Sequence, residues 1–465
     1  MTESSPARQP SVAEALAVYL RPRVLIVLFL GFSSGLPLAL SGSTLQVWAT
    51  ESGVDLKTIG LFTALGTPYT IKFLWAPLVD ALDVPLLSRW LGRRRGWLIF
   101  SQLLLIVAIA LLGLCNPAAS PGLLVLAALF VATASATQDI VVDAFRVESL
   151  PENEQAAGMA SYVAAYRVGM LVSTAGALFL VTGFETWGLG RPSAWSAGYL
   201  VMAACVALGI VTTLIATEPE KSVVALAERA AHARDNPNLL VARTAFAVVT
   251  NPVLHVLRTA FAAFSDFLSS DVAILALIFV VLFKFSDALA GAMTAPFVIK
   301  IGFTRAEYAA IVKVWGFAAT LIGGFAGGFV ARAFPLAASL WIGGVLQAVA
   351  NLGFIWPATV GADPVALTVA ITLENFTSAI GTVIFVAYLS ALCNNPLHTA
   401  TQYALLTALA AVGRTYLSLG AGFIADKAGW PLFFSICVLA GIPSLLLLAW
   451  LQRCGHFAAL ERSNN

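Results

Sequence analysis

Residues 121–144 read PGLLVLAALFVATASATQDIVVDA, an almost continuous apolar run with two carboxylates near its end. About 20 apolar residues in a helix cross the hydrocarbon core of a bilayer, so this segment is predicted to span a membrane. Asp139 and Asp143 lie four residues apart and share one face of that helix. A charge at membrane depth is costly unless it faces protein or water, and such residues therefore mark an ion or solute pathway.

The composition of the whole chain agrees with this interpretation. Of the 465 residues, 59% are hydrophobic and 11% are charged, whereas soluble domains average about 45 to 50% and about 25%. The formal net charge of +2 offers no large basic face to nucleic acid. The cysteines form no pair at metal or redox spacing, and the 4 histidines lie outside the predicted crossings. The sequence predicts an integral membrane protein with no metal, no cofactor and no nucleic-acid partner.

Twelve segments of the chain are long and apolar enough to cross a bilayer. Their approximate ranges are 24–41, 59–78, 97–115, 121–144, 158–182, 195–217, 272–299, 308–331, 335–357, 365–391, 401–424 and 430–451. They form two sets of six with a polar stretch between them. The predicted fold is therefore all-α, with 12 transmembrane helices in two six-helix halves. This is the organisation of the major facilitator superfamily, whose halves rock around a site at the bilayer midplane.

These segments divide the chain into five parts. They are a cytoplasmic N-terminus (1–23), an N-terminal bundle (24–217), a cytoplasmic connection (218–271), a C-terminal bundle (272–451) and a cytoplasmic C-terminus (452–465). Most of the 26 Lys and Arg residues lie in the connections on the side shared by both termini. Because positive charge favours the cytoplasmic side, both termini are expected there.

The central connection contains apolar residues at helical spacing. Leu254, Leu257 and Phe261 recur at three- and four-residue steps among polar neighbours, which predicts a helix lying along the membrane surface. The alternative is two further crossings within 239–269, for fourteen in all. Pro252 and the nearby polar residues leave each of those pieces too short or too charged.

Nine ionisable residues lie inside the predicted crossings: Lys72, Asp139, Asp143, Arg167, Lys284, Asp287, Lys313, Glu374 and Arg414. We expect them to line one water-filled passage between the halves. Their mixed charge has a slight positive excess, which suits a solute that carries carboxylates. The four carboxylates are the candidates for proton coupling, because neighbouring buried carboxylates repel each other and one can take up a proton.

Two pairs of opposite charges are expected among these residues. Lys72 and Asp139 lie at similar depth, and they form either an ion pair that opens when a proton arrives or a permanent salt bridge between two helices. Lys284 and Asp287 are three residues apart and neutralise each other on one helical face. Four aromatic residues either stack on sugar rings or pack the helices: Tyr69, Tyr162, Tyr166 and Trp315.

Several motifs resemble those of a known family. They are GFSSGLPL at 31–38, KFLWAPLVD at 72–80, GRRRGW at 92–97, QDIVVDA at 138–144, Glu374 with Asn375, and ATQYALL at 400–406. In this order, and over nearly all the crossings, they are similar to the motifs of AmpG-type muropeptide permeases of the major facilitator superfamily.

The resemblance implies a function. It implies a proton-driven carrier that imports N-acetylglucosaminyl-anhydro-N-acetylmuramyl peptides from the periplasm for cell-wall recycling. Such a carrier lies in the bacterial inner membrane, works through the proton gradient and needs no cofactor, and we expect a monomer. The family motif positions are matched by Lys72, Asp139, Asp143, Lys284, Asp287, Glu374 and Gln402. The expected substrate-binding or charge network also includes Gln138, Asn375, Arg167, Lys313 and Arg414.

A further part of the resemblance concerns gating. The cytoplasmic gating signature of the superfamily is similar to Asp80 taken with Gly92, Arg93, Arg94 and Arg95. The match has departures: Ala81 and Leu82 replace the expected basic neighbourhood, and an extra stretch through Trp90 separates the acidic residue from the arginines.

Other functions stay open at this point. Carriers in the broader family transport acetyl-CoA, peptides or drugs, although acetyl-CoA would favour a more basic passage. An integral-membrane enzyme acting on a cell-wall lipid would need a nucleophile, a base or a metal cluster near the interface, and the sequence offers only scattered carboxylates. A passive channel would not need paired titratable groups inside two matched halves.

Overall fold

A computed structural model describes residues 17–151, 154–219, 273–392 and 399–463, which form helices and contain no strand. The N-terminal half contains α2 (Pro22–Ala39), α3 (Leu45–Glu51), α4 (Leu56–Leu61), α5 (Thr67–Ile71), α6 (Ala76–Ala81), α7 (Leu87–Leu91), α8 (Arg93–Gly113), α9 (Pro121–Ser149), α10 (Gln155–Leu171), α11 (Ala177–Thr186) and α12 (Arg191–Ile215). The C-terminal half contains α15 (Ala273–Phe283), α16 (Phe285–Lys300), α17 (Arg305–Tyr308), the π-helical η8 (Ala309–Trp315), α18 (Gly316–Ala333), α19 (Leu336–Ala350), α20 (Ile355–Val360), α21 (Pro364–Ala391), α22 (Thr399–Leu417), α23 (Ala421–Ala428), α24 (Trp430–Leu439), α25 (Ile442–Arg453) and α26 (His456–Ser463).

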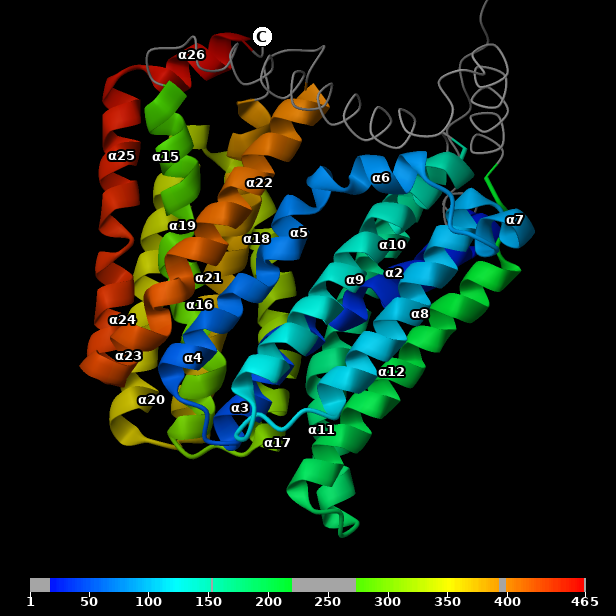
Figure 1. Ribbon diagram of the computed structural model, residues 1–465. Helices are drawn as coiled ribbons and strands as arrows, with labels where there is room; N and C mark the ends of the chain where they lie inside the picture. The colour runs from blue at the N-terminus through cyan, green and yellow to red at the C-terminus, as the bar shows by residue number, and fades with distance from the viewer. Residues whose placement is uncertain (1–16, 152–153, 220–272, 393–398, 464–465) are drawn as a thin grey trace, which may run out of the picture.

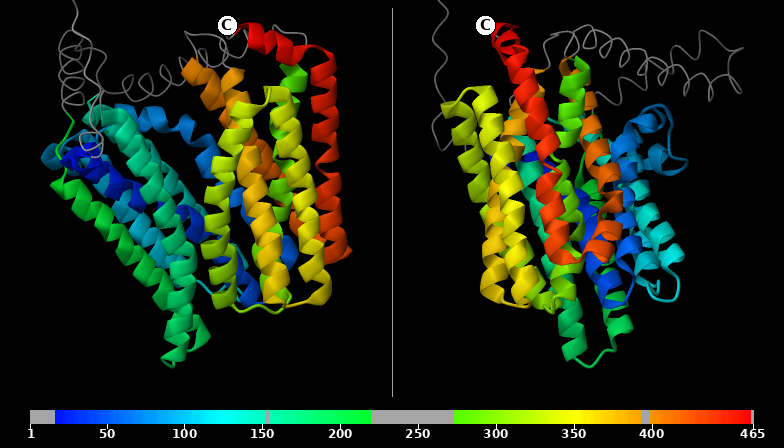
Figure 2. Two further views of the ribbon diagram at one scale, coloured as in Figure 1. Left: turned by 180° about the vertical axis from the view of Figure 1, so that it is seen from behind. Right: turned by 90° about the vertical axis from the view of Figure 1, so that its left-hand side faces the viewer.

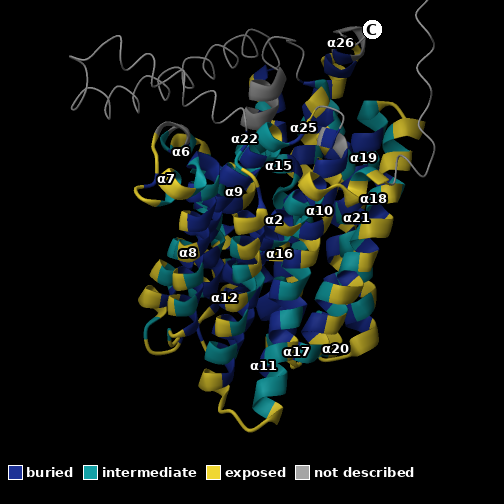
Figure 3. Ribbon diagram, turned by 90° about the vertical axis from the view of Figure 1, so that its right-hand side faces the viewer, coloured by how far each residue is buried: buried dark blue, intermediate teal, exposed yellow. Residues whose placement is uncertain are grey.

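The outer surface of the molecule fits lipid. Within the described residues, 11 helices are long and apolar enough to cross a membrane, and each coincides with a predicted crossing. Large apolar side chains are exposed on them, including Leu126 at 63%, Phe325 at 82% and Phe329 at 72%. Figure 3 shows such exposed positions along the outer faces of the long helices. A surface of this kind is stable in hydrocarbon and would be unfavourable in water.

The predicted crossing at 59–78 is broken into short pieces instead of forming one helix. The pieces are α4, a 3-10 turn (Phe62–Gly66), α5, a second 3-10 turn (Lys72–Leu74) and α6. Pro68 and Pro77 each stand in the first turn of a new piece, where a missing amide donor is tolerated. Figure 1 shows α4, α5 and α6 running in order from one end of the molecule to the other. The described residues therefore still make twelve crossings, six in each half.

The two halves lie side by side with their helices running between two common ends (Figure 1, Figure 2). The α7 end carries α6, α7 and α26, and the α17 end carries α3, α17 and α20. Residues 220–272 fall outside the described part of the chain. The predicted surface helix and the fourteen-crossing alternative fall there as well.

Close helix pairs position the residues that face the interior. A Cβ on Gly35 of α2 would overlap the carbonyl oxygen of Tyr166 on α10, and a Cβ on Gly323 of α18 would overlap that of Phe376 on α21. Small residues allow helices to approach this closely inside a membrane. The pairs α2 with α10 and α18 with α21 therefore fix the two helices, α10 and α21, that carry Arg167 and Glu374.

Candidate functional site

An ion pair in the C-terminal half occupies the break between α15 and α16. Lys284 Nζ lies 2.9 Å from Asp287 Oδ2, which confirms the predicted pairing. The same ammonium group donates to Gln347 Oε1 at 3.2 Å, and Ser378 Oγ donates to Asp287 Oδ2 at 2.7 Å. Both charges are therefore hydrogen-bonded as well as paired, which offsets much of the cost of removing them from water.

This pair lies beside a cavity of about 440 Å³ between the two halves. The N-terminal half contributes Thr63 and Gly66, and the C-terminal half contributes Lys284, Asp287, Gly291, Glu374, Arg414 and their neighbours. The cavity therefore brings together four residues that the sequence selected, from α15–α16, α21 and α22.

Two further cavities extend this space toward the N-terminal half. A cavity of about 180 Å³ shares Gly291 and Glu374 with the first one and adds Lys313. A third cavity, of about 330 Å³, shares Lys313 and Asn375 with the second and is lined by Arg167 on its other side. Because neighbouring cavities share wall residues, they lie in a row between the halves, and we call this row the passage. It touches six of the nine selected charges, and Lys72, Asp139 and Asp143 do not line it.

Glu374 faces this passage without a basic partner among the residues that the structure describes. Its Oε2 accepts a hydrogen bond of 2.8 Å from Asn375 Nδ2, which also donates to the carbonyl oxygen of Ile371 at 3.0 Å. Thr320 Oγ1 donates to Asn375 Oδ1 at 3.1 Å and fixes the amide. Asn375 therefore holds the carboxylate in one orientation on the wall of the passage.

The second acidic cluster lies within the N-terminal half. Ser34 Oγ donates to Asp139 Oδ1 and lies 3.2 Å from Tyr162 OH. Asp139 is buried, whereas the Asp143 side chain is 46% exposed. The cluster thus joins α2, α9 and α10, and it lines none of the three cavities described above.

Lys72 pairs with Asp143, so the predicted pairing with Asp139 is wrong. Lys72 Nζ lies 3.9 Å from Asp143 Oδ2, and Arg146 Nη2 lies 3.8 Å from Asp143 Oδ1. The physical reason is the broken second crossing, because Lys72 begins a 3-10 turn and does not continue a regular helix. The prediction assumed one regular helix and therefore placed Lys72 at the depth of Asp139. The break moves it by about one turn of α9, to Asp143.

The aromatic residues selected from the sequence do not gather around the passage. The rings of Tyr162 and Tyr166 have centroids 5.9 Å apart and pack inside the N-terminal half. Trp315 donates through Nε1 to Thr372 Oγ1 at 2.8 Å on the exposed side of α21. None of the four aromatic residues lines the three cavities. Gln138 does not line them either, and its side chain donates to Ser33 Oγ at 3.3 Å.

The predicted gating arginines make contacts within the N-terminal half. The Glu218 carboxylate accepts from the backbone N–H groups of Arg94 at 2.9 Å and Arg95 at 3.1 Å, at the start of α8. An acidic group is stabilised at a helix N-terminus. Arg94 Nε also donates to Glu148 Oε2 on α9 at 3.0 Å. The side chains of Asp80 and Gln402 lie outside the described part of the structure.

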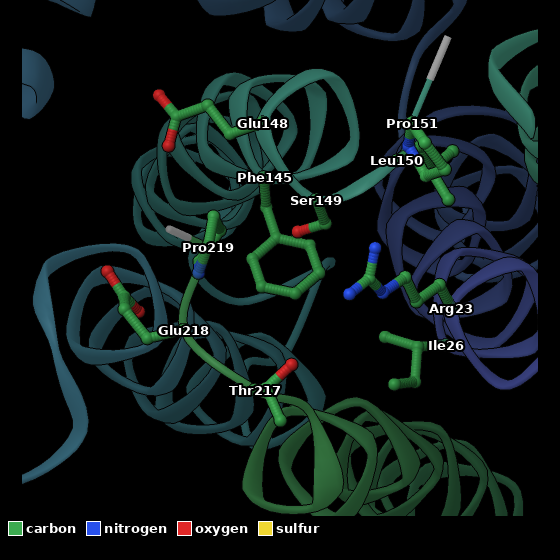
Figure 4. Close-up of a pocket in the computed structure, with 10 residues that line it drawn as sticks. All are labelled: Arg23, Ile26, Phe145, Glu148, Ser149, Leu150, Pro151, Thr217, Glu218 and Pro219. Atoms are coloured by element: carbon green, nitrogen blue, oxygen red, sulfur yellow. The ribbon is translucent and has the colours of Figure 1, made fainter. Parts of the chain in front are cut away.

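These contacts border a separate cavity of about 410 Å³ at the α7 end. Figure 4 shows Phe145 in its middle, with Glu218 on one side and Arg23 on the other. Its walls come from α2, α9 and the end of α12, so the cavity belongs to one half and is distinct from the passage.

The α17 end of the passage is closed by an ion cluster that the sequence did not reveal. Arg305 on α17 donates through Nε to Glu51 Oε1 at 2.9 Å and through Nη2 to Glu185 Oε1 at 3.0 Å. Its guanidinium lies over the Trp195 ring, 5.3 Å from the centroid. Glu185 and Arg305 lie just outside predicted crossings, and Glu51 lies in the predicted connection between the first two, where charged residues are common. These charges join the two halves.

A close backbone contact seals the same end. A Cβ on Gly422 of α23 would overlap the carbonyl oxygen of Leu56 on α4, and Gly60 lies against Gly422. Lys57 Nζ pairs with Asp426 Oδ2 at 3.4 Å beside them. The halves are therefore in contact at the α17 end, while the ion pairs Arg21–Glu154 and Arg94–Glu148 at the α7 end stay within the N-terminal half.

Comparisons with known proteins agree with this architecture. Residues 27–400 match the family profile described as Major Facilitator Superfamily. The anhydromuropeptide permease of Escherichia coli (strain K12) is 38% identical over 437 residues, which cover 94% of this chain and 81% of that protein. The inward open conformation of the xylose transporter XylE from E. coli gives a TM-score of 0.62 at 13% identity, covering 91% of this chain and 94% of that chain. A POT family transporter in complex with 5-aminolevulinic acid gives 0.63 at 12% identity, covering 92% and 95%.

Proposed function

Because this chain belongs to the Major Facilitator Superfamily, and within it to the family of the anhydromuropeptide permease, we propose that it imports anhydro-muropeptides for cell-wall recycling, driven by protons. It is a multi-pass membrane transporter and not an enzyme. The proposed substrates are N-acetylglucosaminyl-anhydro-N-acetylmuramyl peptides, and the proposed site is the bacterial inner membrane with both termini in the cytoplasm. No cofactor is needed beyond the proton gradient.

The observation that carries this proposal is the charged passage between the halves. Its cavities place Arg167, Lys313 and Glu374 around space that both halves share. A solute bound there contacts both halves at once, which is the arrangement that alternating access requires. Cations and carboxylates together suit a ligand that bears both peptide charges and sugar hydroxyls.

The orientation of the chain in the membrane is assigned from its positive charges. Arg93, Arg94 and Arg95 lie at the α7 end, and positive charge favours the cytoplasm, so we assign that end to the cytoplasm. The α17 end, closed by Arg305 and Glu51, then faces the periplasm. In this assignment the described conformation is closed toward the side from which the substrate arrives and suits release into the cytoplasm.

Proton coupling requires a carboxylate that is free to change its charge. Asp143 and Asp287 each have a basic partner, whereas Asp139 and Glu374 are held by neutral hydrogen-bond donors. A carboxylate in an ion pair stays ionised, so we assign proton uptake to the two carboxylates that form no ion pair among the described residues. Glu374 faces the passage and is the group through which a bound solute would affect the proton.

Transport by purified protein in liposomes tests the proposal. An inward proton gradient should drive accumulation of labelled anhydro-muropeptide, and a protonophore should abolish it. If uptake of the muropeptide does not depend on the gradient, the proposed proton coupling is wrong and the proposed substrate stands. Uptake of labelled acetyl-CoA by the same liposomes, with no uptake of labelled muropeptide, would replace the proposed substrate with that of another carrier in the same fold.

A further inference from the structure

Two cations from opposite halves face each other across the 330 Å³ cavity. Arg167 comes from α10 and Lys313 from η8, and the rest of the wall includes Ser43, Thr320 and Asn375. The wall combines these polar groups with apolar side chains, and the two positive charges are the only ionisable groups among the described residues that line it.

Neither cation forms an ion pair among the residues that the structure describes, although Lys313 shares the 180 Å³ cavity with Glu374. In contrast, Lys72 is paired with Asp143 and Lys284 with Asp287. Arg414, the remaining selected cation, lines the 440 Å³ cavity together with two carboxylates. Lys313 Nζ lies over the Tyr308 ring, 5.4 Å from its centroid, a contact that steadies the ammonium group without neutralising it. A cation at membrane depth that has no acidic partner is costly to maintain, which points to a ligand that supplies the missing charge.

We propose that Arg167 and Lys313 form an anion subsite that binds the carboxylate groups of the peptide part of the substrate. This inference rests on the proposed function and deepens it. A guanidinium can grip a carboxylate through two parallel hydrogen bonds, and an ammonium supplies a point charge from the other side. Because the two cations stand on different halves, a carboxylate between them links the halves through the ligand.

The proposed subsite and the paired charges have different roles in binding a solute. The paired charges Lys284 and Asp287 stay neutral as a unit, so they offer hydrogen bonds to a solute but no net attraction. Within the 330 Å³ cavity, net attraction for an anion comes from Arg167 and Lys313. Arg414 adds a third cation in the 440 Å³ cavity, where it shares the wall with Asp287 and Glu374. The carrier should therefore select muropeptides by the charge of the peptide as well as by the sugar.

Equilibrium binding to the purified full-length protein tests this subsite. The probes are an anhydro-muropeptide with free peptide carboxylates and the same molecule with those carboxylates converted to carboxamides. Wild type should prefer the acidic form by on the order of tenfold to a hundredfold, the range for lost charge-assisted hydrogen bonds. The double variant Arg167→Gln with Lys313→Gln should bind both forms equally, at the wild-type affinity for the carboxamide.

Two further variants serve as controls for loss of charge and for loss of folding. Lys300→Gln removes one exposed positive charge outside the passage and should keep the preference. Arg167→Lys with Lys313→Arg keeps both charges and should retain most of it, which separates loss of charge from loss of folding. A double glutamine variant that keeps the preference, or a Lys300→Gln variant that loses it, overturns the subsite.

Thermal stability in citrate separates failure of the subsite from failure of the proposed function. Citrate, a simple polycarboxylate, should raise the melting temperature of wild type and not that of the double glutamine variant. If wild type binds neither muropeptide but citrate still distinguishes the two proteins, the substrate is wrong and the anion subsite stands. If citrate stabilises both proteins equally, or neither, the subsite is wrong.

Discussion

Arg305 and Glu51, which lie 254 positions apart in the sequence, form a bidentate ion pair between the two halves. The Nε to Oε1 and Nη2 to Oε2 distances are both 2.9 Å, and the side chains are only 6% and 12% exposed. Trp195 Nε1 adds a hydrogen bond of 3.2 Å to Glu51 Oε2. When the halves separate at this end, water reaches both charges and the ion pair loses most of its stabilising free energy. The pair therefore favours the conformation that is closed at the α17 end.

Loss of this pair should shift the conformational equilibrium. Arg305→Gln leaves Glu51 buried without a cation, which destabilises the closed end. We expect the ratio of open to closed molecules at the α17 end to rise by on the order of tenfold or more. Distances between spin labels on α11 and α20 measure that ratio. Arg191→Gln is the control, because Arg191 also pairs with Glu185 but within one half and with its side chain 61% exposed. An unchanged distance distribution in Arg305→Gln would contradict the role of the pair.

Gly422 should be essential for closing the same end. In Gly422→Ala the new methyl group overlaps the carbonyl oxygen of Leu56, so α4 and α23 cannot reach their present separation. We expect uptake to fall at least tenfold, with the spin-label distances shifted toward the open state. Gly420→Ala is a matched control two residues away, because nothing lies within 4 Å of its added Cβ. Equal uptake by the two variants would show that the contact is dispensable.

The pair Lys284 and Asp287 should behave as one unit in stability measurements. Asp287→Asn leaves a cation that is only 16% exposed beside neutral groups, and we expect it to destabilise the protein by about 3 kcal/mol. The double variant with Lys284→Gln removes both charges and should recover more than half of that loss. Thermal unfolding in detergent measures both. Additive losses in the double variant would mean that the two side chains act independently.

The docking of α26 should weaken in acid. Tyr388 OH lies 3.1 Å from His456 Nε2, and burial lowers the pKa of His456 below its ordinary value of 6.5. Below pH 6.5 the undocked helix takes up a proton that the docked helix does not, so docking weakens progressively as the pH falls from 6.5 toward the lowered pKa. Hydrogen-exchange protection of α26, compared at pH about 7.5 and about 5.5, measures this loss. His456→Gln should remove the pH dependence. If hydrogen-exchange protection of α26 in the wild type is unchanged in acid, His456 does not control its docking.

Local relations could be predicted from the sequence, and long-range ones could not. Lys284 and Asp287 are three residues apart, so helical geometry alone predicted their pairing. The predicted partner of Lys72 was wrong because a break in the second crossing moves the lysine by about one helical turn. Arg305 and Glu51 lie in different halves at the ends of crossings, where charges are ordinary. Only the docking of the halves makes them neighbours.

Glu374 offers the sharpest test of proton coupling. Its carboxylate lines the passage and accepts from Asn375, an amide that would hydrogen-bond equally well to a glutamine side chain. Glu374→Gln therefore keeps the shape and the hydrogen bond but removes the proton site. We expect gradient-driven accumulation in liposomes to fall at least tenfold, while exchange of labelled for unlabelled substrate without a gradient stays within about twofold. Asp143→Asn is the comparison, because Asp143 is already paired with Lys72 and Arg146 and should not carry the transported proton. Equal loss of accumulation and exchange in Glu374→Gln would assign this carboxylate to substrate binding or folding, and proton uptake would then fall to Asp139.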